Sequence, residues 1–186
     1  ISKNEFIFGY EGNIDSLLLE PISTLPEGFS SSIYRDAEKD TLHYWFKPAI
    51  DDETTDSLLF LAKNRYTVDT LEVNIKKIFI DSLKVSISKG GVLTPRDTFQ
   101  LQFNTPLMSI DETRISILDK DSIAVPLTTL RDTLYNRANI IFEKKPDQRY
   151  NIIGLPGTFT DYFDATNDTL RYSVKTKTAD DYGDIT

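Results

Sequence analysis

The chain has 186 residues, a formal net charge of −8 and no cysteine, and 39% of its residues are hydrophobic. At the usual ~100–200 residues per domain, this length allows one domain or two small ones. The negative charge argues against nucleic acid as a partner, because too few cations are present to neutralise a run of phosphates. No apolar run approaches the ~20 residues of a membrane-spanning helix, so no direct membrane insertion of this segment is expected. Disulfides do not hold the fold.

The N-terminal half shows short segments of apolar residues bounded by Gly, Pro, Asn and Asp, a pattern that predicts strands. We expect these strands at residues 4–10, 14–19, 29–34, 41–47, 57–62 and 69–77. Two of them contain continuous apolar runs, Leu17–Leu19 and Leu58–Leu61, whose length fits fully buried strands better than helices. Sustained helical spacing is nearly absent from the chain, so the expected class is all-β.

The predicted strand 41–47 carries aromatic residues on both faces. Because side chains alternate along a strand, His43 and Trp45 share one face, and Leu42, Tyr44 and Phe46 share the other. We expect one face to lie in a core and the other to meet a neighbouring domain.

The C-terminal half begins a second series of strands after the apolar segment Ile78–Ile80. Its clearest alternation is Phe99, Leu101 and Phe103, with amide residues between them. The predicted strands are 83–88, 97–104, 113–118, 123–129, 138–142, 149–155 and 168–176. Seven strands in roughly a hundred residues is the number found in an immunoglobulin-like sandwich.

We therefore predict two tandem immunoglobulin-like β-sandwich domains, residues 1–80 and 81–178, joined near residues 78–82. The tail, residues 179–186, has few groups to bury and is expected to be a linker to a further domain. The chain begins at Ile1 and not at a methionine, which is typical of a piece of a longer protein.

A short motif, Asp followed by Ser or Thr and then Leu, recurs along the chain. Its aspartates are Asp15, Asp40, Asp56, Asp69, Asp81, Asp132 and Asp168. Aspartate side chains accept hydrogen bonds from turn backbone, and leucine is often the first inward residue of the strand that follows. We interpret the motif as turn-to-strand punctuation and consider a repeated ligand site the weaker alternative.

The C-terminal half resembles the bacterial Ig-like domain first described in surface-layer proteins. The residues that carry this resemblance are Phe99–Phe103 with Asn104–Leu107, Ile115–Asp119 with Val125-Pro126, Arg149–Ile153, and Asp161–Asp164 with Asn167–Leu170. The family has a glycine in the turn where this chain has Asp164, so we expect that turn to be reshaped. The whole chain is also similar to multi-domain Ig-like lipoproteins on Gram-negative cell surfaces, through Thr41–Phe46, Asn167–Leu170 and Asp181–Gly183. These resemblances imply export and a scaffold or adhesion role.

Residues that could carry catalysis or bind zinc are few. His43 is the only histidine, and a nucleophilic serine needs a sharp exposed turn, for which no Gly-x-Ser-x-Gly sequence is present. We predict no catalytic residue, no cofactor-binding residue and no metal ligand, with His43 as an ordinary strand residue. Zinc is equally disfavoured, since the chain has no cysteine and one histidine.

Calcium is the more serious alternative, because two loops are rich in carboxylates. One loop contains Asp161, Asp164, Asn167 and Asp168, and the other contains Asp51, Asp52, Glu53 and Asp56. Neither spacing matches an EF-hand. Aspartate and asparagine also cap turns through bonds to their own backbone, and we favour that interpretation.

The function predicted from the sequence is non-enzymatic: a spacer, scaffold or interaction segment of a secreted, surface-anchored bacterial protein. Its partners are then neighbouring domains of the full-length protein, and another surface protein or a glycan. The alternative is a carbohydrate-binding module that stacks sugars on aromatic side chains. The candidates for stacking are Tyr34, Tyr44, Trp45, Tyr162 and Phe163. Tyr150 resembles the tyrosine of a Greek-key corner, whose hydroxyl bonds back to the chain.

Overall fold

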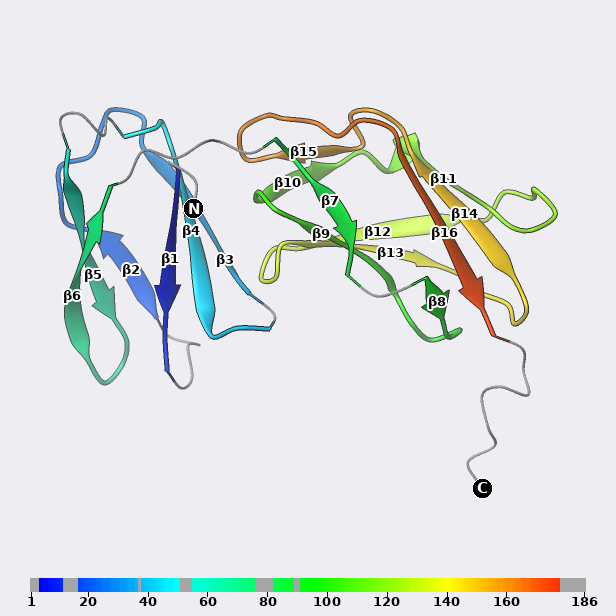
Figure 1. The fold of residues 1–186 in the computed structure, drawn as a ribbon, viewed down its shortest axis with the longest axis horizontal. Helices are drawn as coiled ribbons and strands as arrows, with labels where there is room; N and C mark the ends of the chain where they lie inside the picture. The colour runs from blue at the N-terminus through cyan, green and yellow to red at the C-terminus, as the bar shows by residue number, and fades with distance from the viewer. Residues whose placement is uncertain are drawn as a thin grey trace, which may run out of the picture. The chain divides into compact units, whose positions relative to one another are not determined.

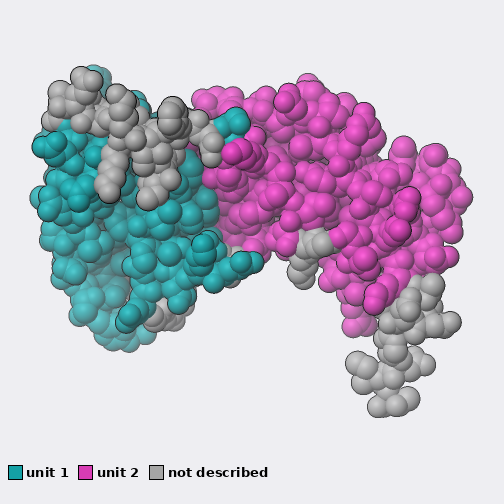
Figure 2. All heavy atoms as spheres, viewed as in Figure 1, with its two compact units in different colours: residues 1–82 teal, residues 83–186 magenta. Residues whose placement is uncertain are grey.

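The computed structural model describes residues 4–11, 17–36, 38–50, 55–75, 82–88 and 91–177. Across these ranges the chain forms sixteen strands and one three-residue 3-10 helix, which confirms the all-β prediction. The chain divides into two compact units, residues 1–82 and residues 83–186, shown in different colours in Figure 2. The predicted tail and most of the predicted joining segment lie outside the described residues.

Unit 1, residues 1–82, contains two antiparallel three-stranded sheets with the orders β1-β4-β3 and β2-β5-β6 (Figure 1). The strands are β1 (Glu5–Gly9), β2 (Leu18–Pro21), β3 (Ser30–Arg35), β4 (Thr41–Lys47), β5 (Ser57–Lys63) and β6 (Val68–Asn74). Both sheets contribute to one core, in which Phe60 of β5 contacts the rings of Phe6, Phe8 and Tyr44. These edge-to-face contacts, with ring centroids 5.1–5.7 Å apart, are the arrangement that aromatic quadrupoles favour.

Unit 2, residues 83–186, contains two four-stranded sheets, with the orders β12-β13-β9-β7 and β11-β14-β16-β8, and the two-stranded sheet β10-β15. Its strands are β7 (Val85–Ile87), β8 (Val92–Leu93), β9 (Phe99–Phe103), β10 (Leu107–Ile110), β11 (Ile115–Leu118), β12 (Leu127–Asp132), β13 (Arg137–Phe142), β14 (Arg149–Gly154), β15 (Phe159–Asp161) and β16 (Leu170–Thr176). All described pairs are antiparallel except β16 with β8, which is parallel.

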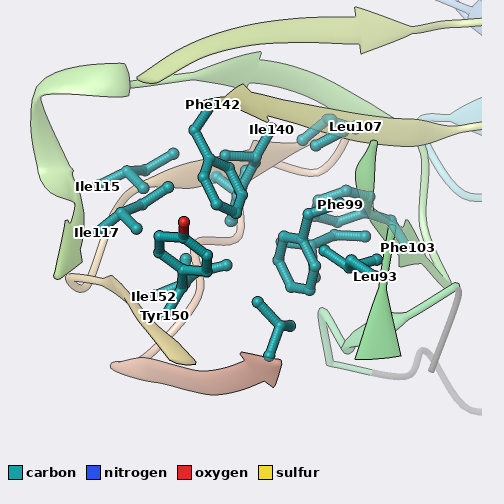
Figure 3. Close-up of a cluster of buried hydrophobic side chains, with 14 residues drawn as sticks. Leu93, Phe99, Phe103, Leu107, Ile115, Ile117, Ile140, Phe142, Tyr150 and Ile152 are labelled. Carbon is teal, nitrogen blue, oxygen red and sulfur yellow. The ribbon is translucent and has the colours of Figure 1, made fainter. Parts of the chain in front are cut away.

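The core of unit 2 is one cluster built from the inward faces of these sheets. Phe99, Leu101 and Phe103 of β9 are all at most 2% exposed, as their alternation predicts. They meet residues of β13, β11 and β14, and Figure 3 shows the labelled side chains converging from opposite sides. The burial of every second residue on β9 confirms the prediction made for this strand.

Three strands of unit 2, namely β8, β10 and β15, were not predicted. They have two, four and three residues, which is too short for a period of two to stand out, and each is held by a partner distant in sequence. The strand predicted at 123–129 instead begins at Leu127. The preceding residues form a turn in which the Asp119 carboxylate accepts from the amides of Asp121 and Ile123, and Ser122 has φ 63°.

The prediction of fully buried strands at residues 17–19 and 58–61 is wrong. Leu19, Leu58 and Phe60 point into the core of unit 1, but Leu18 is 49% exposed and Leu59 is 39% exposed. Both segments are therefore half-buried strands with leucine on the outer face. A run of apolar residues conceals the period of two that normally distinguishes such a strand.

Candidate functional site

His43 lies on the face of β4 opposite the core, between two carboxylates. Its ring stacks on Tyr34 of β3, with centroids 4.7 Å apart and planes 9° apart. Nδ1 lies 2.5 Å from Oε1 of Glu5, on β1, and Nε2 lies 3.8 Å from Oδ2 of Asp36. Both ring nitrogens thus face carboxylates. This geometry ties the three strands of the sheet together, whereas a nucleophile-activating histidine presents one nitrogen to a hydroxyl or thiol.

Asp161, the first residue of the candidate calcium loop, is 2% exposed, and both of its carboxylate oxygens accept hydrogen bonds from protein donors. Oδ1 accepts from the amides of Phe163 (2.9 Å) and Ala165 (2.8 Å), and Oδ2 accepts from the hydroxyl of Thr105 (2.7 Å). The bonds to residues two and four positions ahead form an Asx-type turn. The bond to Thr105 also fixes this turn to the connection between β9 and β10.

Asn167 is buried in the same loop and holds its far side. Its Oδ1 accepts from the amide of Phe159 (2.7 Å), and its Nδ2 donates to the carbonyls of Leu155 (3.0 Å) and Asp168 (2.6 Å). Asp164 is exposed and adopts φ 64°. The structure therefore places a left-handed residue where the family resemblance implies glycine, so the aspartate takes the conformation that glycine usually supplies.

Asn136 is a structural residue that the sequence analysis missed. It is buried with φ 54°, and its Oδ1 accepts from the amide of Leu107 (2.7 Å). Its Nδ2 donates to the carbonyls of Phe103 (3.0 Å) and Thr105 (2.8 Å). A single amide thereby holds the connection between β9 and β10. The signal available in the sequence was an asparagine just before a strand, which indicates a turn but not its distant partners.

The second predicted acidic loop falls largely outside the described residues, which include Asp56 but not Asp51, Asp52 or Glu53. In the part of the chain that the structure describes, no three His, Cys, Asp or Glu side chains are grouped so that they could hold a metal ion. The carboxylates of the 161–168 loop are likewise not gathered into one site, since Asp161 points inward while Asp164 and Asp168 are exposed.

The aromatic residues proposed to stack on sugars are mostly buried. Tyr34, Tyr44, Trp45 and Tyr162 are between 1% and 7% exposed, and Phe163 is intermediate. Tyr44 belongs to the core of unit 1. These residues therefore do not form an aromatic row on a solvated strand face on which a sugar could stack.

Tyr150, near the start of β14, has the hydrogen bond predicted for it. Its buried ring packs edge-to-face on Phe142, with centroids 5.1 Å apart, and its hydroxyl oxygen accepts from the amide of Lys145 at 2.8 Å. The bond reaches five residues back along the chain, as in a tyrosine corner. This confirms the prediction that the hydroxyl bonds back to the chain.

Among the described residues of unit 2, the pKa values of three titratable groups are shifted from their ordinary values. Burial lowers the pKa of Lys144, whose ammonium donates to the Phe142 carbonyl (2.9 Å) and lies 4.4 Å from the centroid of that ring. Burial raises the pKa of Tyr172. The hydrogen bond from the Thr113 hydroxyl lowers the pKa of Asp111, which caps the 3-10 helix. Each shift follows from packing or from a local turn.

The structure establishes an all-β chain of two compact units. In unit 2, the buried side chains of Asp161, Asn167 and Asn136 bond to loop backbone. The sequence matches no protein-family model and no curated protein. Among solved structures, domains 4–9 of the surface layer protein SbsC match with 9% identity and a TM-score of 0.33, over 95% of this chain and 29% of that one. None of the described helices has the length and apolar character needed to cross a membrane.

Proposed function

We propose that this chain is a non-enzymatic structural segment, a spacer or scaffold, of a secreted bacterial surface protein, and that its two units are tandem immunoglobulin-like sandwiches. The strand order of unit 2 supports the fold. Its sheets β7-β9-β13-β12 and β8-β16-β14-β11 have the order expected for the ABED and GFC sheets of such a domain, with β8 as an added edge strand. The short motifs that resemble bacterial Ig-like domains support the surface location.

The observation that carries the functional proposal is how the buried polar side chains are used. Asp161, Asn167 and Asn136 each make three bonds to backbone or hydroxyl groups of their own unit. Such fully bonded networks rigidify a fold. A catalytic or binding constellation would instead direct polar groups toward a pocket where a ligand is held. These three buried polar residues therefore serve to hold the loops of unit 2.

The proposal is tested first by mechanical unfolding of the full chain between fixed ends. A spacer in a surface protein carries tension, and we expect two separate unfolding events, one for each unit. A single event that releases the whole chain at once would contradict two independent sandwiches.

The second test addresses activity directly, with hydrolase substrates and a glycan array. We expect neither turnover nor glycan binding. Turnover that disappears in His43→Ala, while circular dichroism and the melting temperature remain those of the parent, would overturn the non-enzymatic proposal. Saturable glycan binding would replace it with the carbohydrate-binding alternative.

A further inference from the structure

The outer face of the β2-β5-β6 sheet exposes aliphatic side chains. Because Leu19 and Phe60 point into the core, their neighbours along each strand point outward. The exposed members are Leu18 (49%), Ile22 (54%), Leu59 (39%) and Val68 (60%). The outer face of an antiparallel sheet is usually polar when water covers it, and gathered apolar side chains on a surface mark an interaction site.

The register of the strands arranges this face in rows. Leu18, Lys63 and Val68 form the row nearest the β5–β6 turn, since Leu18 pairs with Lys63 and Lys63 pairs with Val68. The next outward row is Glu20, Leu61 and Thr70.

The last of these rows pairs Leu59 with Glu72. Ile22 joins it, because the Ile22 amide donates to the Leu59 carbonyl at 2.8 Å. Each end row thus combines aliphatic side chains with one charge, a cation at one end and an anion at the other.

The charge at the turn end is reinforced by Arg65, whose guanidinium lies 4.6 Å from the centroid of the Tyr66 ring. At the opposite end the Glu72 carboxylate accepts from the Ser57 hydroxyl (2.8 Å) and is exposed. A partner of uniform charge would complement only one of these ends. A second copy turned end to end complements both ends, and it places Leu61 on Leu61 and Glu20 opposite Glu20 in the middle row.

We propose that the outer face of β2-β5-β6 binds the same face of a second copy of this chain. The twofold axis runs across the strands, so that the Lys63 row of one copy lies on the row of Leu59 and Glu72 of the other. In such an isologous contact the same surface of both copies takes part, so each contact between two different rows occurs twice. It covers the aliphatic side chains and brings the Lys63 ammonium to the Glu72 carboxylate of the partner, with the lysine stem over Leu59.

The experiment is sedimentation equilibrium of the full chain over a wide range of concentration. We expect a monomer–dimer equilibrium for the parent. Leu61→Asp, in the middle row, places the new carboxylates of the two copies opposite each other and should weaken association at least tenfold. Val68→Asp, which faces the partner's row of Leu59 and Glu72, is the second variant. The matched control is Leu130→Asp, on β12 of unit 2, where Leu130 is 58% exposed; it should leave association unchanged. Circular dichroism and melting temperature verify that each variant is folded.

A charge exchange tests the orientation of the two copies. Lys63→Glu should weaken association, and Lys63→Glu combined with Glu72→Lys should restore it, because the pair is reversed and not removed. A chain that stays monomeric at every concentration overturns the proposal. A dimer that is insensitive to both Leu61→Asp and Val68→Asp also overturns the proposal, because it would use another surface. Failure of the double variant to recover association would refute the axis across the strands.

Discussion

The two units of the chain fill their cores with different side chains. Unit 1 relies on rings, and Phe60 alone contacts three others. Most members of the unit 2 core are aliphatic, and its rings meet mainly in pairs such as Phe103 with Phe159. Rings add directional contacts to the burial of apolar area. Both units are therefore all-β, but their cores are packed with different kinds of side chain.

The units also differ in how their connections are fixed. In unit 2, three buried side chains, Asp161, Asn167 and Asn136, each hold loop backbone with several hydrogen bonds. In unit 1, a polar contact between His43 and Glu5 joins two strands. In the β5–β6 turn of unit 1, Asn64 also holds loop backbone, since its Oδ1 accepts from the amides of Tyr66 and Thr67. The difference among the described residues is that Asn64 is only partly buried, whereas the three residues of unit 2 are buried.

The largest effect is expected from removing one ring of each core. Phe60→Ala and Phe103→Ala should each cost about 3–5 kcal/mol, because a buried phenylalanine leaves both lost transfer energy and a cavity. If the cores are independent, Phe60→Ala shifts only the unfolding of unit 1, and Phe103→Ala only that of unit 2. Denaturant unfolding of the full chain, followed alongside fragments 1–82 and 83–186, measures this. Destabilisation of both units by either change would mean that they share one core.

The control for Phe103 has to be chosen on the same strand. Gln102 is unsuitable, because its amide donates to the Tyr135 carbonyl (3.1 Å) and its Oε1 accepts from Arg137 (2.8 Å). Gln102→Ala should cost about 1 kcal/mol. Gln100, on the same outer face, takes part in neither bond, and Gln100→Ala should cost under ~0.5 kcal/mol. Equal costs for Gln100 and Phe103 would show that both faces of β9 are buried.

Removing the Asp161 carboxylate is the next largest change. Asp161→Ala leaves two loop amides and the Thr105 hydroxyl without their acceptor. It should lower the free energy of unfolding by about 2–4 kcal/mol. Asp161→Asn, which keeps an acceptor oxygen, should cost less. Calorimetric melting of unit 2 measures both.

The same residue tests the calcium alternative. A metal that binds only the folded state raises its stability by RT ln(1 + [L]/Kd). We expect equal melting temperatures in millimolar calcium and in chelator. A rise with calcium that Asp161→Asn abolishes would replace the Asx-turn interpretation with a metal site.

Lys144 makes the stability of unit 2 dependent on pH. Burial lowers the pKa of Lys144 in the folded protein below its ordinary value of 10.5. At a pH between the folded and the unfolded pKa, the unfolded chain binds more protons than the folded protein, so stability rises with pH. Lys144→Met removes this contribution. Its stability gain over the parent should be largest at about pH 8 and shrink towards about pH 10. Thermal melts across that range measure the difference, and a constant difference would show that the ammonium is not desolvated.

The smallest effect is expected at Asp164. Its φ of 64° is costly for a residue with a Cβ, and glycine adopts it freely. Asp164→Gly should therefore stabilise unit 2, although the greater freedom of glycine in the unfolded chain opposes part of the gain. The net gain should be about 0.5 kcal/mol. Asp168→Gly, at a neighbouring exposed residue without positive φ, is the control and should not stabilise. Loss of stability in Asp164→Gly would mean that the side chain holds the turn.

The sequence alone determined the all-β class and the inward residues of the clearest strands. The alternation of Phe99, Leu101 and Phe103 predicts their burial because a strand with one buried face must repeat every two residues. The same rule fails for Leu58–Leu61, where apolar residues occupy both faces. The outward leucines are then indistinguishable from core residues until the sheet is assembled.

Only the tertiary structure decided which polar residues hold the loops and which surface is left apolar. Asp161 and Thr105 are separated by 56 positions, yet their side chains form one hydrogen bond. The short strands β8, β10 and β15 exist because distant segments pair with them. Local propensity acts over a few neighbouring residues, whereas these bonds and faces arise when remote segments are brought together, so no local pattern encodes them.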